Sequence, residues 1–132
     1  MGRDNGVGYE KLMLDKRLGV VAERYGCYYT LYMQIEWDER KNRANIRKHE
    51  LDFSDAWKVF MQPVLITLDE RSGEEYAEDR WIGIGLLDET RIVVIIFTEL
   101  EEDVIRVISF RKALTYEREQ YQEAYRDEFG AV

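Results

Sequence analysis

The chain has 132 residues and a formal net charge of −8 at pH 7, and 45% of its residues are hydrophobic. This length and composition predict one globular domain with a core of its own and argue against disorder. The acidic balance argues against nucleic-acid binding by bulk charge, so an RNA or DNA ligand would have to meet a local basic patch.

Cysteine and histidine are too few for the usual disulfide and metal sites. The single cysteine, Cys27, excludes an intrachain disulfide and a cysteine-based zinc site, and the lone histidine argues against a transition-metal site. The longest purely apolar run, Ile92 to Phe97, is far too short to cross a membrane, and the N-terminus lacks a secretory apolar segment. These features predict a soluble cytoplasmic protein with no cofactor.

The first 32 residues combine a helical periodicity with an aromatic segment. The periodicity predicts a helix from about Glu10 to Arg24, and the aromatic residues from Cys27 to Tyr32 favour a strand. Met33 then opens the segment MQIEWDE, which suggests that residues 1–32 are an appendage from an upstream translation start. The alternative is one long strand over Tyr28–Trp37, with the extension packed as real structure.

The stretch from Trp37 to Phe60 contains a basic run, whereas the chain as a whole is acidic. Asp38 is a good N-cap for a helix that runs to about His49, the only histidine. This helix has few apolar residues, so it must lie on another element. A basic run that ends in a group titrating near neutrality suits a polyanion. From residue 40 to residue 48 it has no acid and five basic residues: Arg40, Lys41, Arg43, Arg47 and Lys48.

Two further features of this stretch concern its faces. Lys41, Asn45 and Lys48 recur at i, i+4 and i+7, so they are predicted to share one helical face. A second short helix follows, capped by Asp52 or Ser54. Its apolar stripe, predicted to lie in the core with Trp37, consists of Phe53, Ala56, Trp57 and Phe60.

Four strands and a last helix are predicted in the second half, after Pro63 ends the helical pattern. Polar segments separate the strands, including an acidic hairpin loop over residues 99–103. Thr115 is predicted to cap the last helix, which continues to about Glu128. The four strands are Val64–Leu68, Glu78–Leu87, Ile92–Phe97 and Val104–Arg111.

The order of these elements predicts an α+β fold. Short loops between the last four strands favour an antiparallel meander. The expected architecture is a small antiparallel sheet, made of this meander and the N-terminal strand from Met33 to Trp37, packed with two N-terminal helices and a C-terminal helix.

Three sequence motifs occur in order along the chain. The first is formed by Trp37, Asp38, Lys41, Asn45, Lys48, His49, Phe53, Ala56 and Phe60. The second is formed by Glu78, Arg80, Trp81 and Gly85, with Asp79 between the acid and the arginine. The third is formed by Arg106, Val107, Ile108, Ser109, Arg111, Ala113, Glu117, Arg118 and Tyr121.

Together these motifs resemble the BrnT toxins of bacterial type II toxin–antitoxin systems. The resemblance covers about residues 33–121, which divides the chain into an extension over 1–32 and a toxin-like domain over 33–132. The chain departs from the family pattern at Glu50, where the family has glycine, and at Phe110, where it has alanine.

The resemblance implies a fold similar to RelE-type toxins and endoribonuclease activity. It also implies a partner, a BrnA-like antitoxin with a ribbon-helix-helix domain. Operator DNA would be contacted only through that antitoxin, and no membrane is involved. A homodimer through the exposed sheet face is a further possibility that the sequence leaves open.

Metal-independent RNA cleavage uses the ribose 2′-OH to attack the adjacent phosphorus, and it needs a base, an acid and cations. His49 has the intrinsic pKa for acid or base work. With one histidine, the second proton transfer falls to Glu78, a lysine, a tyrosine or water. Arg80, Arg106 and Arg111 are the candidate clamps for the phosphorane charge, because a guanidinium fork matches phosphate oxygens.

Three further residues are candidates for RNA contact. Lys41 and Lys48 belong to the basic helix, and Trp81 could stack on a base. Each also has a structural interpretation, since exposed lysines are often only solvated and a tryptophan in a strand often belongs to the core.

The candidate catalytic residues have structural alternatives as well. His49 could simply end its helix, where the C-terminal dipole favours its charge. Glu78 could form a structural ion pair with Arg80, its neighbour on the same strand face. In a regular strand, Arg106 and Arg111 would point to opposite faces, so only one of them would reach a common site.

Glu50 argues against strong activity. Glycine would supply the left-handed position that ends the basic helix, and glutamate is worse there. Its charge would raise the pKa of His49 if the two side chains are close, and it would repel phosphate. The alternative function is therefore a catalytically weak or inactive BrnT-like protein that acts mainly as an antitoxin-binding or co-repressor module. A chance resemblance of an unrelated acidic domain is the weakest interpretation.

Overall fold

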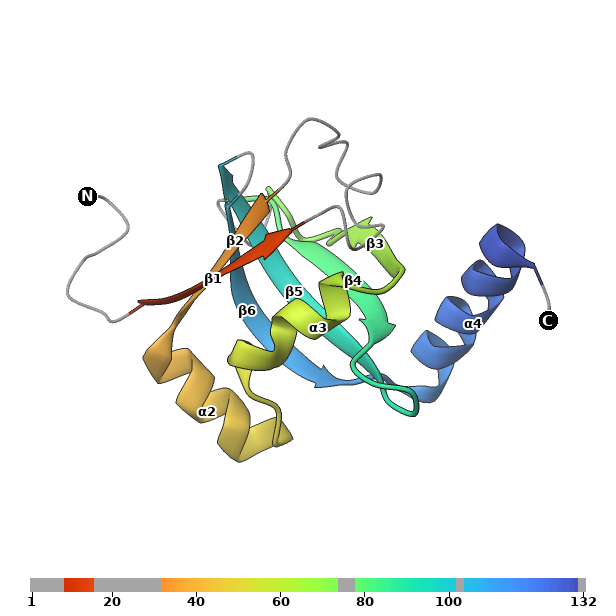
Figure 1. Ribbon diagram of the computed structural model, residues 1–132, viewed down its shortest axis with the longest axis horizontal. Helices are drawn as coiled ribbons and strands as arrows, with labels where there is room; N and C mark the ends of the chain where they lie inside the picture. The colour runs from red at the N-terminus through yellow and green to blue at the C-terminus, as the bar shows by residue number, and fades with distance from the viewer. Residues whose placement is uncertain (1–8, 16–31, 74–77, 102–103, 131–132) are drawn as a thin grey trace.

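The computed structural model describes residues 9–15, 32–73, 78–101 and 104–130. Its elements form one sheet with helices on its faces (Figure 1). In chain order they are β1 (Tyr9–Asp15), β2 (Tyr32–Asp38), α2 (Glu39–His49), the 3-10 turn η2 (Phe53–Asp55), α3 (Ala56–Phe60), β3 (Val64–Leu68), β4 (Trp81–Leu86), β5 (Ile92–Glu101), β6 (Val104–Lys112) and α4 (Thr115–Phe129).

The sheet has six strands in the order β1-β2-β6-β5-β4-β3. The last four strands form the predicted antiparallel meander, and the α+β class is confirmed. The prediction of a wholly antiparallel sheet is wrong, because β2 pairs with β6 in parallel. Loop lengths predict the direction only of strands that follow each other in sequence, and here two helices and three strands intervene.

The N-terminal prediction fails where it can be compared with the structure. Residues Tyr9–Asp15 form a strand that pairs antiparallel with β2, so the predicted helix is wrong from Glu10 to Asp15. Pairing along the free edge of β2 outweighs the helical spacing of the apolar residues. The rest of that helix and residues 27–31 of the aromatic segment lie outside the described residues. The division of the chain at residue 32 stays a prediction.

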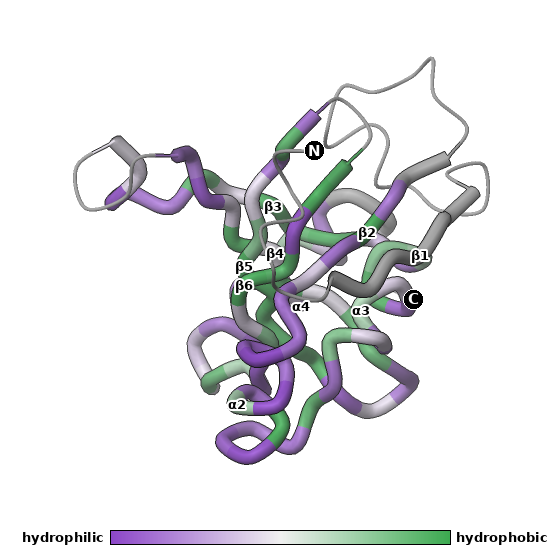
Figure 2. Tube along the Cα trace, turned by 90° about the vertical axis from the view of Figure 1, so that its left-hand side faces the viewer, coloured by the Kyte–Doolittle hydropathy of each residue, from purple (hydrophilic) through white to green (hydrophobic). Residues whose placement is uncertain are grey.

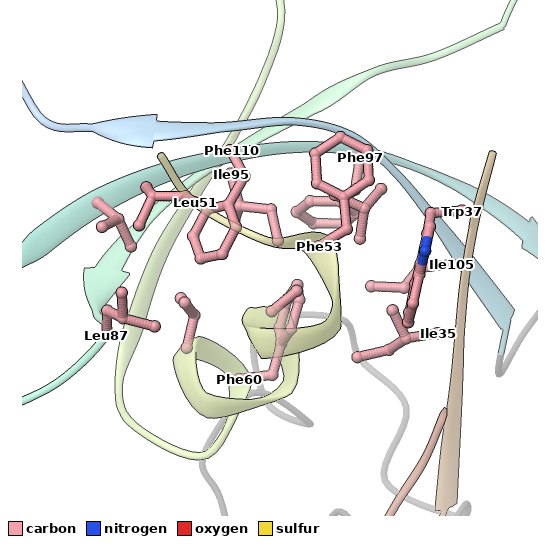
Figure 3. Close-up of a cluster of buried hydrophobic side chains, with 14 of the residues drawn as sticks. Ile35, Trp37, Leu51, Phe53, Phe60, Leu87, Ile95, Phe97, Ile105 and Phe110 are labelled. Atoms are coloured by element: carbon pink, nitrogen blue, oxygen red, sulfur yellow. The ribbon is translucent and has the colours of Figure 1, made fainter. Parts of the chain in front are cut away.

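The main core lies between the sheet and the segment that contains η2 and α3. Phe60 meets Phe97 edge to face, with ring centroids 5.4 Å apart. Trp57 was predicted to lie in this core but is 36% exposed, because it falls on the outer side of a single helical turn. Figure 3 shows part of this cluster, including Ile35, Trp37, Leu51, Phe53, Phe60, Leu87, Ile95, Phe97, Ile105 and Phe110.

A second, smaller core lies on the opposite face of the sheet, under α4. Tyr121 packs there against Ile84 and Val94, and its hydroxyl donates to the Pro63 carbonyl at 2.8 Å. Burial raises the pKa of Tyr121 to about 12. This single aromatic residue fixes α4 on the sheet and also ties the helix to the start of β3.

A β-bulge interrupts β6. Ser109 lies opposite Ile96, but Val107 lies opposite Phe97, so Ile108 is an extra residue on β6. A bulge of this kind inverts the alternation of side chains beyond it.

Two predicted strand ends differ from the structure. β4 begins at Trp81, so Glu78 and Arg80 precede the strand instead of lying within it. β5 continues through Glu101, so the predicted acidic loop is strand over residues 99–101, because pairing with β6 continues there. Among the described residues, no helix has the length and apolar character required to cross a membrane.

Candidate active site

Helix α2 begins as the sequence predicts. The Asp38 side chain accepts hydrogen bonds from the backbone N–H groups of Arg40 at 2.8 Å and Lys41 at 3.4 Å. These bonds satisfy two of the free N–H groups of the first helical turn, so the start of the basic segment is fixed.

A buried amide attaches α2 to the sheet. The Asn45 side chain donates to the carbonyls of Leu51 at 3.0 Å and Phe110 at 2.8 Å, and it accepts from the Phe110 N–H at 3.2 Å. The predicted common face is therefore split, because Asn45 is buried while Lys41 and Lys48 are exposed. The helix lies on the sheet through hydrogen bonds in place of an apolar stripe.

Asn42 makes a second attachment, one turn earlier. Its side chain accepts from the Phe53 N–H at 2.8 Å and donates to Asp52 at 2.9 Å. Asp52 in turn accepts from the Ser54 N–H, which confirms it as the cap of the next helical segment. With both asparagines facing inward, the remaining polar positions of α2 face outward.

The outward face of α2 is strongly basic, and Figure 2 colours most of this helix as hydrophilic. All five basic residues of the run are exposed. Within the described part of the chain, none of them forms an ion pair. We call this face, which consists of Arg40, Lys41, Arg43, Arg47 and Lys48, the basic surface of α2.

His49 is half-buried at the C-terminal end of this surface. Burial first, and then the charges of Lys48 and Arg111, lower the pKa of His49 below its ordinary value of 6.5. The rise that Glu50 would cause if it were close does not decide the net shift, because burial and the two cations determine its sign. At pH 7 most of the imidazole is therefore neutral and able to accept a proton.

Glu50 ends α2 in the left-handed conformation, with φ 59° and ψ 28°. Its N–H donates to the Ile46 carbonyl at 2.8 Å. The left-handed geometry that was predicted for this position is therefore confirmed. Glycine adopts such a φ readily, whereas a residue with a side chain is disfavoured there.

We expect Glu50→Gly to raise the free energy of unfolding by about 0.5–1 kcal/mol. The left-handed conformation costs a residue with a side chain about 1–2 kcal/mol, and glycine removes this cost. The greater freedom of glycine in the unfolded chain reduces the resulting gain in stability by about 0.5–1 kcal/mol. Urea denaturation measures the change. Glu50→Gln is the matched control, since it removes the charge and keeps the strain; an equal gain in both variants would attribute the effect to charge.

Arg111 is held by a carboxylate of α4. Its Nη1 and Nη2 atoms donate to the two oxygens of Glu117 at 2.8 and 2.9 Å. This bond raises the pKa of Arg111 and lowers that of Glu117. Glu117 also accepts from the Leu114 N–H at 2.8 Å. Leu114 therefore occupies the N-cap position, and Thr115, the predicted cap, is the first helical residue.

The other two candidate clamps are also paired with carboxylates. Arg106 donates to Glu36 on β2 at 3.1 Å, and Glu36 is completely buried. Arg80 donates to Glu78 at 3.3 Å on the surface, so the ion pair that the sequence offered as an alternative is present. A phosphate would have to compete with a carboxylate for each of the three arginines.

The bulge in β6 decides which way two of these arginines point. It places Arg106 and Arg111 on the same face of the sheet, so the prediction of opposite faces, which assumed a regular strand, is wrong. Arg106 lies opposite Thr98, and Arg111 lies opposite Val94, near the other end of the strand. About four strand spacings of 3.3 Å separate them, or roughly 13 Å along β6.

The candidate residues therefore form two groups and not one site. Arg111 is close enough to His49 for its charge to act on the imidazole, and α2 lies near the C-terminal end of β6 in Figure 1. Arg106 lies toward the N-terminal end, and its neighbour Thr98 donates to the carbonyl of Asp79, beside Arg80.

The structure favours a structural role for Trp81 and brings two carboxylates, Glu36 and Glu117, into the candidate site. Trp81 is half-buried and packs against the main core, which favours its structural interpretation. Glu36 and Glu117 were not singled out, although they hold two of the candidate arginines. A possible signal for Glu117 was its position in the first turn of a helix and in the third motif. For Glu36 the signal was an acid between the apolar residues of a strand.

A family model described as the ribonuclease toxin BrnT of type II toxin–antitoxin systems matches residues 37–117, which is more than half of the chain. The chain belongs to this family, and the resemblance seen in the three motifs is confirmed. A 1.1 Å crystal structure of the Brucella abortus ribonuclease toxin BrnT is 31% identical, covers 60% of this chain and 94% of that one, and superposes with a TM-score of 0.49. A search of curated proteins gives no match.

Proposed function

We propose that this chain is a metal-independent endoribonuclease toxin that cleaves RNA by 2′-OH attack, with His49 as the general base. The observation that carries the proposal is the basic surface of α2 on a chain of net charge −8: its five cations make no ion pair with the residues that the structure describes, and it ends at His49. A neutral imidazole beside such a surface suits the removal of a proton from a ribose hydroxyl.

RNA lies along the basic surface in this proposal. Lys41 and Lys48 are seven residues apart, or about 10 Å along the helix, so they contact different parts of one strand. Lys48 and Arg111 provide positive charge near the reacting phosphate. Glu78 belongs to the distant group of Arg80, so the proton of the leaving 5′-oxygen comes from a lysine, a tyrosine or water.

The protein partner follows from the family. Type II toxins are neutralised by a protein antitoxin, and we propose a ribbon-helix-helix antitoxin for this chain, acting in the cytoplasm. Operator DNA is then contacted through the antitoxin, because the chain as a whole is acidic and RNA occupies the basic surface of α2 in this proposal.

The second candidate function is an antitoxin-binding module with weak or absent catalysis. One observation favours it: the three candidate clamps Arg80, Arg106 and Arg111 are all engaged by carboxylates. The charge of Glu50 next to His49 favours it as well. Cleavage of purified RNA in EDTA separates the two functions. If the folded protein cuts neither free RNA nor RNA on translating ribosomes, the chain acts as an antitoxin-binding module.

Neutralising part of the basic surface should weaken RNA binding. For the double variant Arg43→Gln/Arg47→Gln we expect a lower affinity, and a plot of log K against log salt that is less steep by about 1.4, since each lost contact to a single strand removes about 0.7. Fluorescence anisotropy with a short single-stranded RNA measures both quantities.

The matched control is Lys58→Gln/Arg126→Gln, which removes two exposed basic residues elsewhere on the protein. If this control weakens binding as much as the α2 variant does, the basic surface has no special role in RNA recognition.

A further inference from the structure

Glu117 connects the N-terminus of α4 to the candidate active site. We propose that Glu117 is a positioning residue of this site: its carboxylate fixes the guanidinium of Arg111 beside His49, so that the arginine acts on the imidazole through its charge. The consequence for catalysis rests on the proposed role of His49 as the general base.

The geometry of the pair restricts Arg111 strongly. Two parallel hydrogen bonds of 2.8 and 2.9 Å hold the guanidinium plane, where a single bond would allow rotation. The carboxylate is itself fixed, because it is buried to 6% exposure and accepts from the Leu114 N–H. The backbone of α4 therefore holds the Glu117 carboxylate, and this carboxylate in turn holds the guanidinium of Arg111.

The backbone of the site is held from the other side by α2. Asn45 is bonded to both backbone groups of Phe110, the residue before Arg111. His49 follows Asn45 by four residues, so it lies one turn further along the same side of the helix. The same bonds that dock α2 thus bring His49 to the end of β6 where Arg111 emerges.

Two charged residues flank His49 in the sequence. Lys48, its neighbour in sequence, is exposed, and its charge disfavours the imidazolium. Glu50, an exposed acid, follows on the other side. Both are on the surface, where solvent screens them.

The charged groups that face His49 from the other elements are less exposed to solvent than these two flanking residues. Arg111, from β6, has only 27% of its side chain exposed. Glu117 and Tyr116, both from α4, lie near the guanidinium. A fixed and partly buried cation disfavours protonation of a nearby imidazole, which keeps His49 in the neutral form that accepts a proton. Because Glu117 occupies Nη1 and Nη2, the arginine is poorly placed to grip phosphate with its fork.

The sign of one pKa change tests this role. If Glu117 acts only by its own charge, Glu117→Gln removes an anion and lowers the pKa of His49. If Glu117 acts by holding Arg111, the same variant frees the cation and raises the pKa of His49 toward 6.5. The two mechanisms therefore predict shifts in opposite directions.

NMR titration of His49 provides the measurement without RNA, and the only histidine of the chain gives a single imidazole signal. We expect the pKa to rise in Arg111→Met and in Glu117→Gln, with no further rise in the double variant. The control Glu119→Gln removes an exposed acid of the same helix and should leave the pKa unchanged or slightly lower. A pKa that falls or stays constant in Glu117→Gln overturns the proposal.

A second variant serves if Glu117→Gln does not fold. Glu117→Asp keeps the charge but shortens the side chain, so it cannot make both bonds to Arg111, and it should also raise the pKa of His49. No shift in this variant overturns the proposal equally. Cleavage assays on the same proteins test the proposed function separately: a correct set of pKa shifts with no cleavage by the wild type keeps the positioning role and rejects the nuclease.

Discussion

Replacing Asn45 with leucine should lower the free energy of unfolding by about 2–4 kcal/mol. The change leaves the N–H and C=O of Phe110 and the C=O of Leu51 without their partner inside the protein, and each buried unsatisfied group costs about 1–3 kcal/mol. Part of that cost is offset, because leucine adds apolar area at the same site. Urea denaturation followed by circular dichroism gives the value.

Ala44→Leu is the matched control, because it adds a leucine at the neighbouring, exposed position of the same helix. It should change the free energy of unfolding by less than about 0.5 kcal/mol. If the two variants lose similar stability, the cost belongs to the helix as a whole, and the attachment of α2 through Asn45 is wrong.

Helix ends and local strands of this protein are readable from the sequence because they depend on neighbouring residues. The cap at Asp38, the end of α2 at His49 and the break at Pro63 all follow from chemistry within a few residues. The left-handed geometry of Glu50 follows in the same way, since a glycine was expected there. Each of these predictions is confirmed.

The docking of α2 is not readable, because it depends on a residue pair far apart in the chain. Asn45 looks like one more polar residue of a basic helix, and only the position of Phe110 makes its amide a core group. The parallel pairing of β2 with β6 has the same origin. Non-local pairing places both features beyond the reach of periodicity.

The candidate site shows the same division. His49 was identified from its type and its place at the end of a basic run. The pairing of Arg106 and Arg111 with Glu36 and Glu117 was missed, because it requires the neighbours of each strand. Their common face was missed because a one-residue bulge leaves no clear mark in an apolar strand. The position of His49 at the end of the basic helix was thus predicted, but the arrangement of the arginines was not.

His49→Ala should reduce RNA cleavage by a factor of about 10²–10⁴, the usual contribution of a general base. The folded structure should be unaffected, since the half-buried imidazole makes no hydrogen bond within the described part of the chain. Initial rates on purified RNA in EDTA, with circular dichroism as a check of folding, measure the effect. A folded variant that cleaves as fast as the wild type would remove His49 from the mechanism.

The pH dependence gives an independent test of the same role. A base works in its neutral form, so kcat/KM should rise with pH through the pKa of free His49 and then level off. Burial, Lys48 and Arg111 lower that pKa, so kcat/KM should reach half of its maximum at a pH below 6.5. Lys48→Gln removes one of the two cations and should move the half-maximal rate to higher pH. His49→Ala should lose this step in the profile. A step that persists in His49→Ala would assign the base to another group, and a half-maximal rate above pH 6.5 in the wild type would contradict the electrostatics of this site.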